Sequence, residues 1–135
     1  MTTTELRIGN HINAMHPHNE ETTPYQTIVR TIYEDSVSTD AYGCFYGFND
    51  PDITAVSGIL LTEEMLPNFG FESMGEDSDG EHWEHDNFIF GYLHKNKYGF
   101  YFAFQHQRIS RYFNTVHGLQ NLFYATTGEE LTLKQ

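Results

Sequence analysis

The stretch TVHGLQNLFYATTGEEL, residues 115–131, has the clearest periodicity in the chain. Its apolar residues recur three, six and seven positions after the first of them, a spacing that places them on one face of an α-helix. These residues are Val116, Leu119, Leu122 and Phe123. Thr115 can cap the helix with its hydroxyl, and Gly128 stands where a helix closes with a left-handed residue. The stretch therefore predicts an amphipathic helix over residues 115–127.

The remainder of the chain predicts mainly strands. Short apolar segments with strand-like alternation cover residues 6–8, 26–33, 41–48 and 53–61, and the clearest hairpin covers residues 87–104 with its turn around Asn96. Residues 11–21 are expected to be a loop. Thr62 can cap a short helix that Pro67 limits to little more than one turn. The predicted fold is α+β: a curved antiparallel sheet with one C-terminal amphipathic helix and one short helix.

Length and composition predict one intracellular domain. The 135 residues are enough for a real core, and 11 Phe with 9 Tyr make much of that core aromatic. Cys44 is the sole cysteine, so no intrachain disulfide can form, and it is expected to be a small buried hydrophobe. The N-terminus lacks the pattern of a signal peptide, and no apolar run is long enough for a membrane helix. We expect a single domain over residues 1–135 in the cytoplasm of a bacterial host cell, without membrane contact.

The net charge of −12 is unevenly distributed. Residues 1–94 carry 17 Asp and Glu against only Arg7 and Arg30, whereas residues 95–135 carry more cations than acids. Such a surface repels phosphate backbones, so direct nucleic-acid binding is not expected. It attracts basic surfaces and accelerates their encounter. The alternative is that acidity only keeps an aromatic-rich domain soluble.

The densest acidic segment is EDSDGEHWEHD, residues 76–86, within a predicted loop insertion over residues 72–86. The segment combines carboxylates with one tryptophan, a residue type that often anchors protein interfaces. The residues expected to contact a partner are Glu76, Asp77, Asp79, Glu81, Trp83, Glu84 and Asp86.

The same segment offers weak candidates for a metal site. If it is helical, His82 and His85 point to one side, and if it is extended, His82 points with Glu84 and Asp86. The spacing matches neither the H-E-x-x-H motif nor a calcium loop, so no metal or other cofactor is expected. The histidines of the N-terminal loop, His11, His16 and His18, are expected to be polar surface. No nucleophile elbow, phosphate-binding glycine loop or dinucleotide fingerprint is present, which argues against an enzyme.

Three words of the sequence carry a family resemblance: LRIGN at residues 6–10, LLTEEMLPNFGF at residues 60–71, and HGLQNLFYATTGEEL at residues 117–131. They resemble, in order, the words L-x-I-G-N, L-T-E-E-x-L-x-x-F-G-F and H-x-L-Q-N-L-x-x-A-x-T-G-E-E-L of a family of small uncharacterised phage and prophage proteins. The sequence departs from that pattern at Pro67 and in the insertion over residues 72–86. The resemblance implies a phage or mobile-element origin and assigns no catalytic residue.

These observations favour a non-enzymatic acidic binding protein. Its expected partner is a basic host protein such as a nucleic-acid-binding nuclease of bacterial defence, inhibited by nucleic-acid mimicry as anti-CRISPR proteins do. That comparison rests on charge and size. The alternatives are a metal-dependent hydrolase using His82 and His85, and a structural or assembly protein of a phage particle. Self-association as a homodimer is left open.

Overall fold

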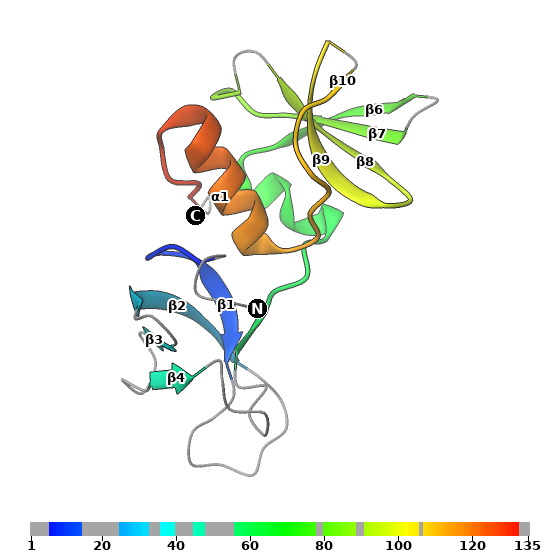
Figure 1. Cartoon of the computed structure of the whole chain (residues 1–135). Helices are drawn as coiled ribbons and strands as arrows, with labels where there is room; N and C mark the ends of the chain where they lie inside the picture. The colour runs from blue at the N-terminus through cyan, green and yellow to red at the C-terminus, as the bar shows by residue number, and fades with distance from the viewer. Residues whose placement is uncertain are drawn as a thin grey trace. The chain divides into compact units, whose positions relative to one another are not determined.

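The chain divides into two compact units, each with its own antiparallel sheet (Figure 1). Unit 1 comprises Met1–Leu60 with Thr115–Asn121, and unit 2 comprises Leu61–Asn114 with Leu122–Gln135. The computed structural model describes residues 6–14, 25–32, 36–39, 45–47, 56–77, 80–88, 91–105 and 107–132. The α+β class is confirmed, with two sheets where one curved sheet was expected. The single domain over residues 1–135 stays a prediction.

Unit 1 holds a five-stranded sheet in the order β4-β3-β2-β1-β5 over the described residues. Its strands are β1 His11–Ala14, β2 Tyr25–Ile32, β3 Ser36–Thr39, β4 Phe45–Gly47 and β5 Val56–Gly58. Two sequence predictions were wrong here, because residues 6–10 form a turn and β1 occupies the start of the predicted loop over residues 11–21. In β1 the buried Ile12 and Ala14 alternate with His11 and Asn13, a period of two that the polar residue types obscure.

Buried amide side chains fix the turn at residues 6–10. The side chain of Gln120, only 2% exposed, accepts from the backbone N–H of His11 at 2.8 Å and donates to the carbonyl of Gly9 at 3.2 Å. Asn121 accepts from Asn10 Nδ2 at 3.0 Å and from Arg7 Nε at 2.8 Å. Buried amides are tolerated when their hydrogen bonds are made. The motifs at residues 6–10 and 117–131, two of the three that carry the family resemblance, are thus joined by hydrogen bonds within unit 1.

Unit 2 holds the second five-stranded sheet, a meander in the order β10-β9-β8-β7-β6. Its strands are β6 Glu72–Asp77, β7 Gly80–Glu84, β8 Tyr92–Asn96, β9 Gly99–Phe104 and β10 Gln107–Arg108. The predicted loop over residues 72–86 is therefore wrong, because β6 and β7 pair there as a hairpin. Residues 72–76 of β6 are exposed on the edge of the sheet, and the strand lacks the apolar alternation by which a strand is recognised.

The predicted hairpin over residues 87–104 is confirmed in its second part only. β8 begins at Tyr92 and its turn is Lys97–Tyr98, one position beyond the expected centre at Asn96. Phe88 belongs to a turn in which its N–H donates to the carbonyl of His85 at 2.9 Å. Phe88 is buried in the core of unit 2 although it lies in a turn. Its alternation with Tyr92 along the sequence therefore does not mark a strand.

The predicted short helix is confirmed, and it consists of two successive 3₁₀ turns. They are η2 Glu63–Met65 and η3 Pro67–Phe69. Thr62 precedes η2 without a side-chain capping hydrogen bond, contrary to expectation. Pro67 opens η3, where its missing N–H costs nothing, and Gly70 closes it at φ 91°. This geometry buries Phe69 in unit 2.

The helix α1, Val116–Thr127, confirms the C-terminal prediction. Thr115 Oγ1 accepts from the N–H of Gly118 at 3.1 Å, and Gly128 adopts φ 75° with its N–H donating to the carbonyl of Tyr124 at 2.8 Å. The apolar stripe is buried at Val116, Leu119 and Phe123. Among the described residues, no helix combines the length and apolar character that crossing a bilayer requires.

Replacing Thr115 with alanine removes the hydroxyl that caps α1. We expect T115A to lower the free energy of unfolding by about 1 kcal/mol, because the freed N–H at the helix start loses its acceptor. Thr115→Ser, which keeps the hydroxyl, is the matched control and should lose little. Urea unfolding of the three proteins measures the difference, and equal losses in T115A and T115S would show that the cap does not stabilise the helix.

Candidate functional site

The inner face of the unit 2 sheet packs against the aromatic core. Trp83 and Leu93 are cross-strand partners on β7 and β8, and Phe102 continues this row on β9. The ring of Phe88 lies 5.1 Å from that of Phe102 and 5.3 Å from that of Phe123. Trp83 is 7% exposed, so a partner cannot reach its ring. The interface anchor expected at Trp83 is therefore part of the core.

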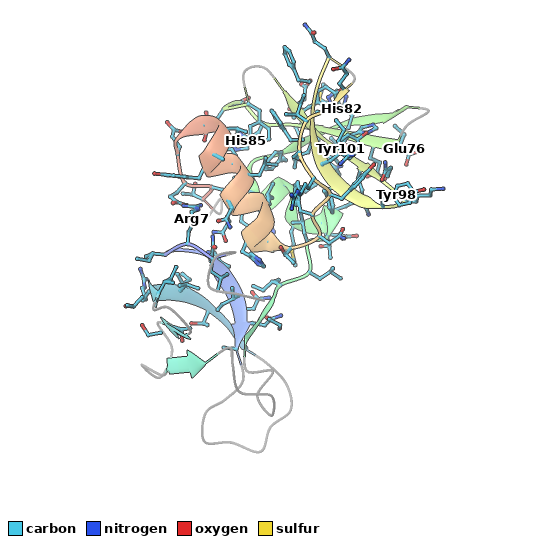
Figure 2. All side chains as sticks on the ribbon, in the orientation of Figure 1. Arg7, Glu76, His82, His85, Tyr98 and Tyr101 are labelled. Atoms are coloured by element: carbon cyan, nitrogen blue, oxygen red, sulfur yellow. The ribbon has the colours of Figure 1, made fainter. Side chains whose placement is uncertain are left out.

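His85 also belongs to the core side of unit 2. Its Nε2 lies 3.2 Å from the carbonyl oxygen of Phe69, and its ring is 4.8 Å from Phe123 and 4.9 Å from Phe71. Figure 2 shows His85 beside α1 and His82 away from it, over the strands. The structure does not bring the two predicted metal candidates together. No group of three or more His, Cys, Asp or Glu suited to a metal ion occurs in the described part of the chain.

The outer face of the sheet carries the alternate residues of the same strands. His82 stacks on Tyr92 with 3.9 Å between ring centroids, and its Nε2 lies 3.4 Å from Glu84 Oε1. His94, 3% exposed, is hydrogen-bonded through Nδ1 to the hydroxyl of Tyr101. Aromatic rings therefore cover the middle of this sheet face.

The acidic hairpin, defined as β6 with β7 and the following Asp86, concentrates carboxylates in one place. Glu76 stands opposite Glu81, and Glu81 stands opposite Lys95, in a row across three strands. The ammonium of Lys95 is already bonded to the carboxylate of Glu63. Where the structure describes the side chains of the hairpin and its exit, the exposed carboxylates are Glu72, Glu76, Glu84 and Asp86.

The carboxylates of this row perturb one another. Loss of hydration, then the hydrogen bond and charge of Glu63, then those of Glu76, raise the pKa of Glu81 above its ordinary value. The hydrogen bond from Lys95 lowers the pKa of Glu63. Of the other predicted contact residues, Asp77 lies in β6 with only its backbone described, and Asp79 lies outside the described residues. In the described part of the hairpin, the carboxylates thus carry more negative charge than the Lys95 ammonium offsets.

A tyrosine–cation patch, which the sequence did not predict, joins the β8–β9 turn to Arg108 of β10 and to Tyr112. It consists of Lys97, Tyr98, Tyr101, Arg108 and Tyr112. Lys97 Nζ lies 5.0 Å from the ring centroid of Tyr98, and Arg108 Cζ lies 4.7 Å from that of Tyr112. The ring of Tyr112 is 5.7 Å from Tyr98 and 5.4 Å from Tyr101. Correct placement of the β8–β9 turn would have put Lys97 and Tyr98 together at the tip of the hairpin.

The remaining predicted residues lie elsewhere. His11 is on β1, half-buried by unit 1, and this burial lowers its pKa. His16, His18 and Cys44 lie outside the described residues. No protein-family model, curated protein or solved structure matches the chain. The described site therefore offers charged groups and aromatic rings on a sheet as its means of binding.

Replacing Glu81 with glutamine should stabilise the protein at neutral pH. A raised folded pKa means that Glu81 favours folding when protonated, and that this contribution is lost as pH rises through the folded pKa. E81Q removes the repulsion from Glu76 and Glu63, so we expect the free energy of unfolding at pH 7 to rise by about 0.5 kcal/mol, as for like charges opposed across strands.

The gain from E81Q should vanish below the ordinary glutamate pKa of 4.5, where the carboxyl is protonated in both states. Urea unfolding at pH 7 and about pH 3.5 measures both values, with Glu64→Gln, an exposed carboxylate of the same unit, as control. A loss of stability in E81Q at pH 7, or a gain independent of pH, would contradict the crowding of charge at Glu81.

Proposed function

We propose that this protein is a non-enzymatic acidic binding protein of phage or mobile-element origin. Its acidic hairpin binds a basic, nucleic-acid-binding surface of a host protein. The observation that carries the proposal is the cross-strand row in which Glu76 stands opposite Glu81 while the Lys95 ammonium beside them is bonded to Glu63. The neighbouring carboxylates of Glu63 and Glu76 also raise the pKa of Glu81. Charge is concentrated there at a cost to the folded protein, and a cationic partner would offset that cost.

The recognition chemistry is that of carboxylates standing in for phosphates. Arginine and lysine side chains bind both groups through charge-assisted hydrogen bonds. The net charge of −12 steers a basic partner toward the protein and accelerates association. An inhibitor of this kind occupies the groove of a defence nuclease, as anti-CRISPR nucleic-acid mimics do. The residues proposed for contact are those of the hairpin with accessible carboxylates.

The positions of His82 and His85 do not support the alternative of a metal-dependent hydrolase. His82 lies on the outer face with Tyr92, whereas His85 contacts Phe71 and Phe123 in the core. A metal-bound water needs several ligands converging on one point. The proposal is therefore restricted to binding.

Affinity capture from a bacterial host lysate tests the proposal. Tagged wild-type protein should recover a basic nucleic-acid-binding protein at low salt and release it at about 0.5 M salt, because exposed charge contacts are screened. The double variant Glu76→Gln/Glu81→Gln should recover about tenfold less of that partner, since each lost charge contact costs a fraction of the binding free energy.

The matched control is Glu64→Gln/Glu130→Gln, which removes the same charge from residues outside the hairpin. It should recover the partner almost as well as the wild type. If the hairpin variant recovers as much partner as the control does, the hairpin is not the binding surface. If the wild type recovers no basic protein at low salt, the proposal as a whole fails.

A further inference from the structure

The tyrosine–cation patch exposes aromatic rings at the end of the unit 2 sheet where the β8–β9 turn lies. Lys97 and Tyr98 form that turn, and the ring centroid of Tyr112 lies 5.7 Å from that of Tyr98. Tyr98 is 62% exposed and Tyr112 is 38% exposed, whereas His94 in the middle of the same sheet face is 3% exposed. The rings of Tyr98 and Tyr112 are therefore open to a ligand, and the middle of the face is not.

The two cations of the patch lie beside these rings. Lys97 and Arg108 are both exposed, and neither takes part in an ion pair with a described residue. The ammonium of Lys97 lies over the ring of Tyr98, and the guanidinium of Arg108 lies over the ring of Tyr112. Arg108 Nη1 also donates to the carbonyl of Ser110 at 3.2 Å. These contacts orient both cations next to exposed aromatic rings.

The acidic row of the hairpin points to the other face of the sheet. Glu81 lies two positions before the buried Trp83 on β7, so its side chain points to the inner face. Tyr101 of the patch belongs to the outer face, where its ring contacts that of Tyr112. Residues 87–128 contain no Asp or Glu. The cations of that segment are Lys95, Lys97, Arg108 and Arg111. The patch is thus a cationic surface on a chain whose net charge is −12.

We propose that the tyrosine–cation patch binds single-stranded nucleic acid. A base stacks on the exposed ring of Tyr98, and the neighbouring phosphates bind Lys97 and Arg108. A single strand suits this chemistry, because its unpaired bases stack on aromatic side chains while its phosphates bind cations. A duplex keeps its bases stacked on each other and brings a higher density of phosphate charge toward an acidic chain. The proposal uses no carboxylate of the acidic hairpin and does not depend on host-protein binding.

The net charge of the chain sets the conditions in which this contact forms. A charge of −12 repels nucleic acid at long range, which restricts binding to a short segment of strand at the patch. At about 0.15 M salt the Debye length is about 8 Å, so repulsion from distant carboxylates is screened more than contacts at the patch. We therefore expect weak binding, with a dissociation constant below about 1 mM at this salt concentration.

Fluorescence anisotropy of a labelled oligothymidylate of about 12 nucleotides, within the range of single-strand site sizes, tests the proposal. Tyr98→Ala should weaken binding about tenfold, because it removes the ring on which a base stacks. Tyr98→Phe keeps the ring and should bind like the wild type. Tyr124→Ala removes an exposed tyrosine of α1, outside the patch, and should also bind like the wild type.

Two arginine variants with the same net charge test the phosphate contact. Arg108→Gln should weaken binding and reduce the slope of log K against log salt by about 0.7, the value for one phosphate contact on a single strand. Arg30→Gln removes an exposed arginine of β2 in unit 1 and should leave the affinity and the slope close to those of the wild type.

Three results would overturn the proposal. The first is the absence of binding by the wild type at concentrations up to about 1 mM. The second is equal affinity of the wild type and Tyr98→Ala, because a stacked base requires the ring. The third is displacement of the labelled strand by polyglutamate of the same length as readily as by unlabelled oligothymidylate. That result would show that the patch binds acidic polypeptides through charge alone.

Discussion

The inner face of the unit 2 sheet packs on an aromatic core, and this packing constrains the other residues of its strands. Trp83 and Leu93 are buried on the inner face, and Phe88 joins that face to Phe123 of α1. Because successive strand residues point to opposite faces, every residue placed inward fixes its neighbours outward. The outer face carries histidine and tyrosine rings, and it is also covered near its centre, where His94 is 3% exposed.

The carboxylates of the acidic hairpin oppose the stability of that sheet. Glu76 and Glu81 face each other across paired strands, and the single ammonium of Lys95 is bonded to Glu63. Like charges at such positions cost stability, and proteins commonly retain such costs where a function needs them. The arrangement gives the proposed binding surface a physical basis: a cationic partner contributes the counter-charge that the chain itself supplies only in part.

Local signals in the sequence were sufficient for the elements that are locally determined. The period of α1 and its caps at Thr115 and Gly128 lie within one segment, and the structure confirms them. β6 was missed because an edge strand of charged and small residues is stabilised by its pairing with β7 and not by an apolar stripe. Burial of Trp83 was missed for the same reason, since a hairpin read as a loop has no inner face.

The contacts of the candidate site depend on the pairing register of the strands, which could not be predicted from the sequence. Glu76 meets Glu81 because β6 carries a bulge between Ser73 and Gly75 that shifts the pairing. The patch joins Tyr98 and Tyr112 through a turn displaced from its predicted centre. Composition alone did indicate the excess of acidic residues over the first 94 residues. Part of that excess lies in the acidic hairpin.

Titration of the glutamate side-chain carboxyls by NMR tests this concentration of charge most directly. The Glu81 carboxyl should titrate above the ordinary range of glutamate, because burial and the carboxylates of Glu63 and Glu76 disfavour its charged form. The Glu63 carboxyl should titrate below that range, because Lys95 donates to it. Ordinary values for both carboxyls would show that the hairpin does not concentrate charge and would remove the physical basis for binding a basic partner.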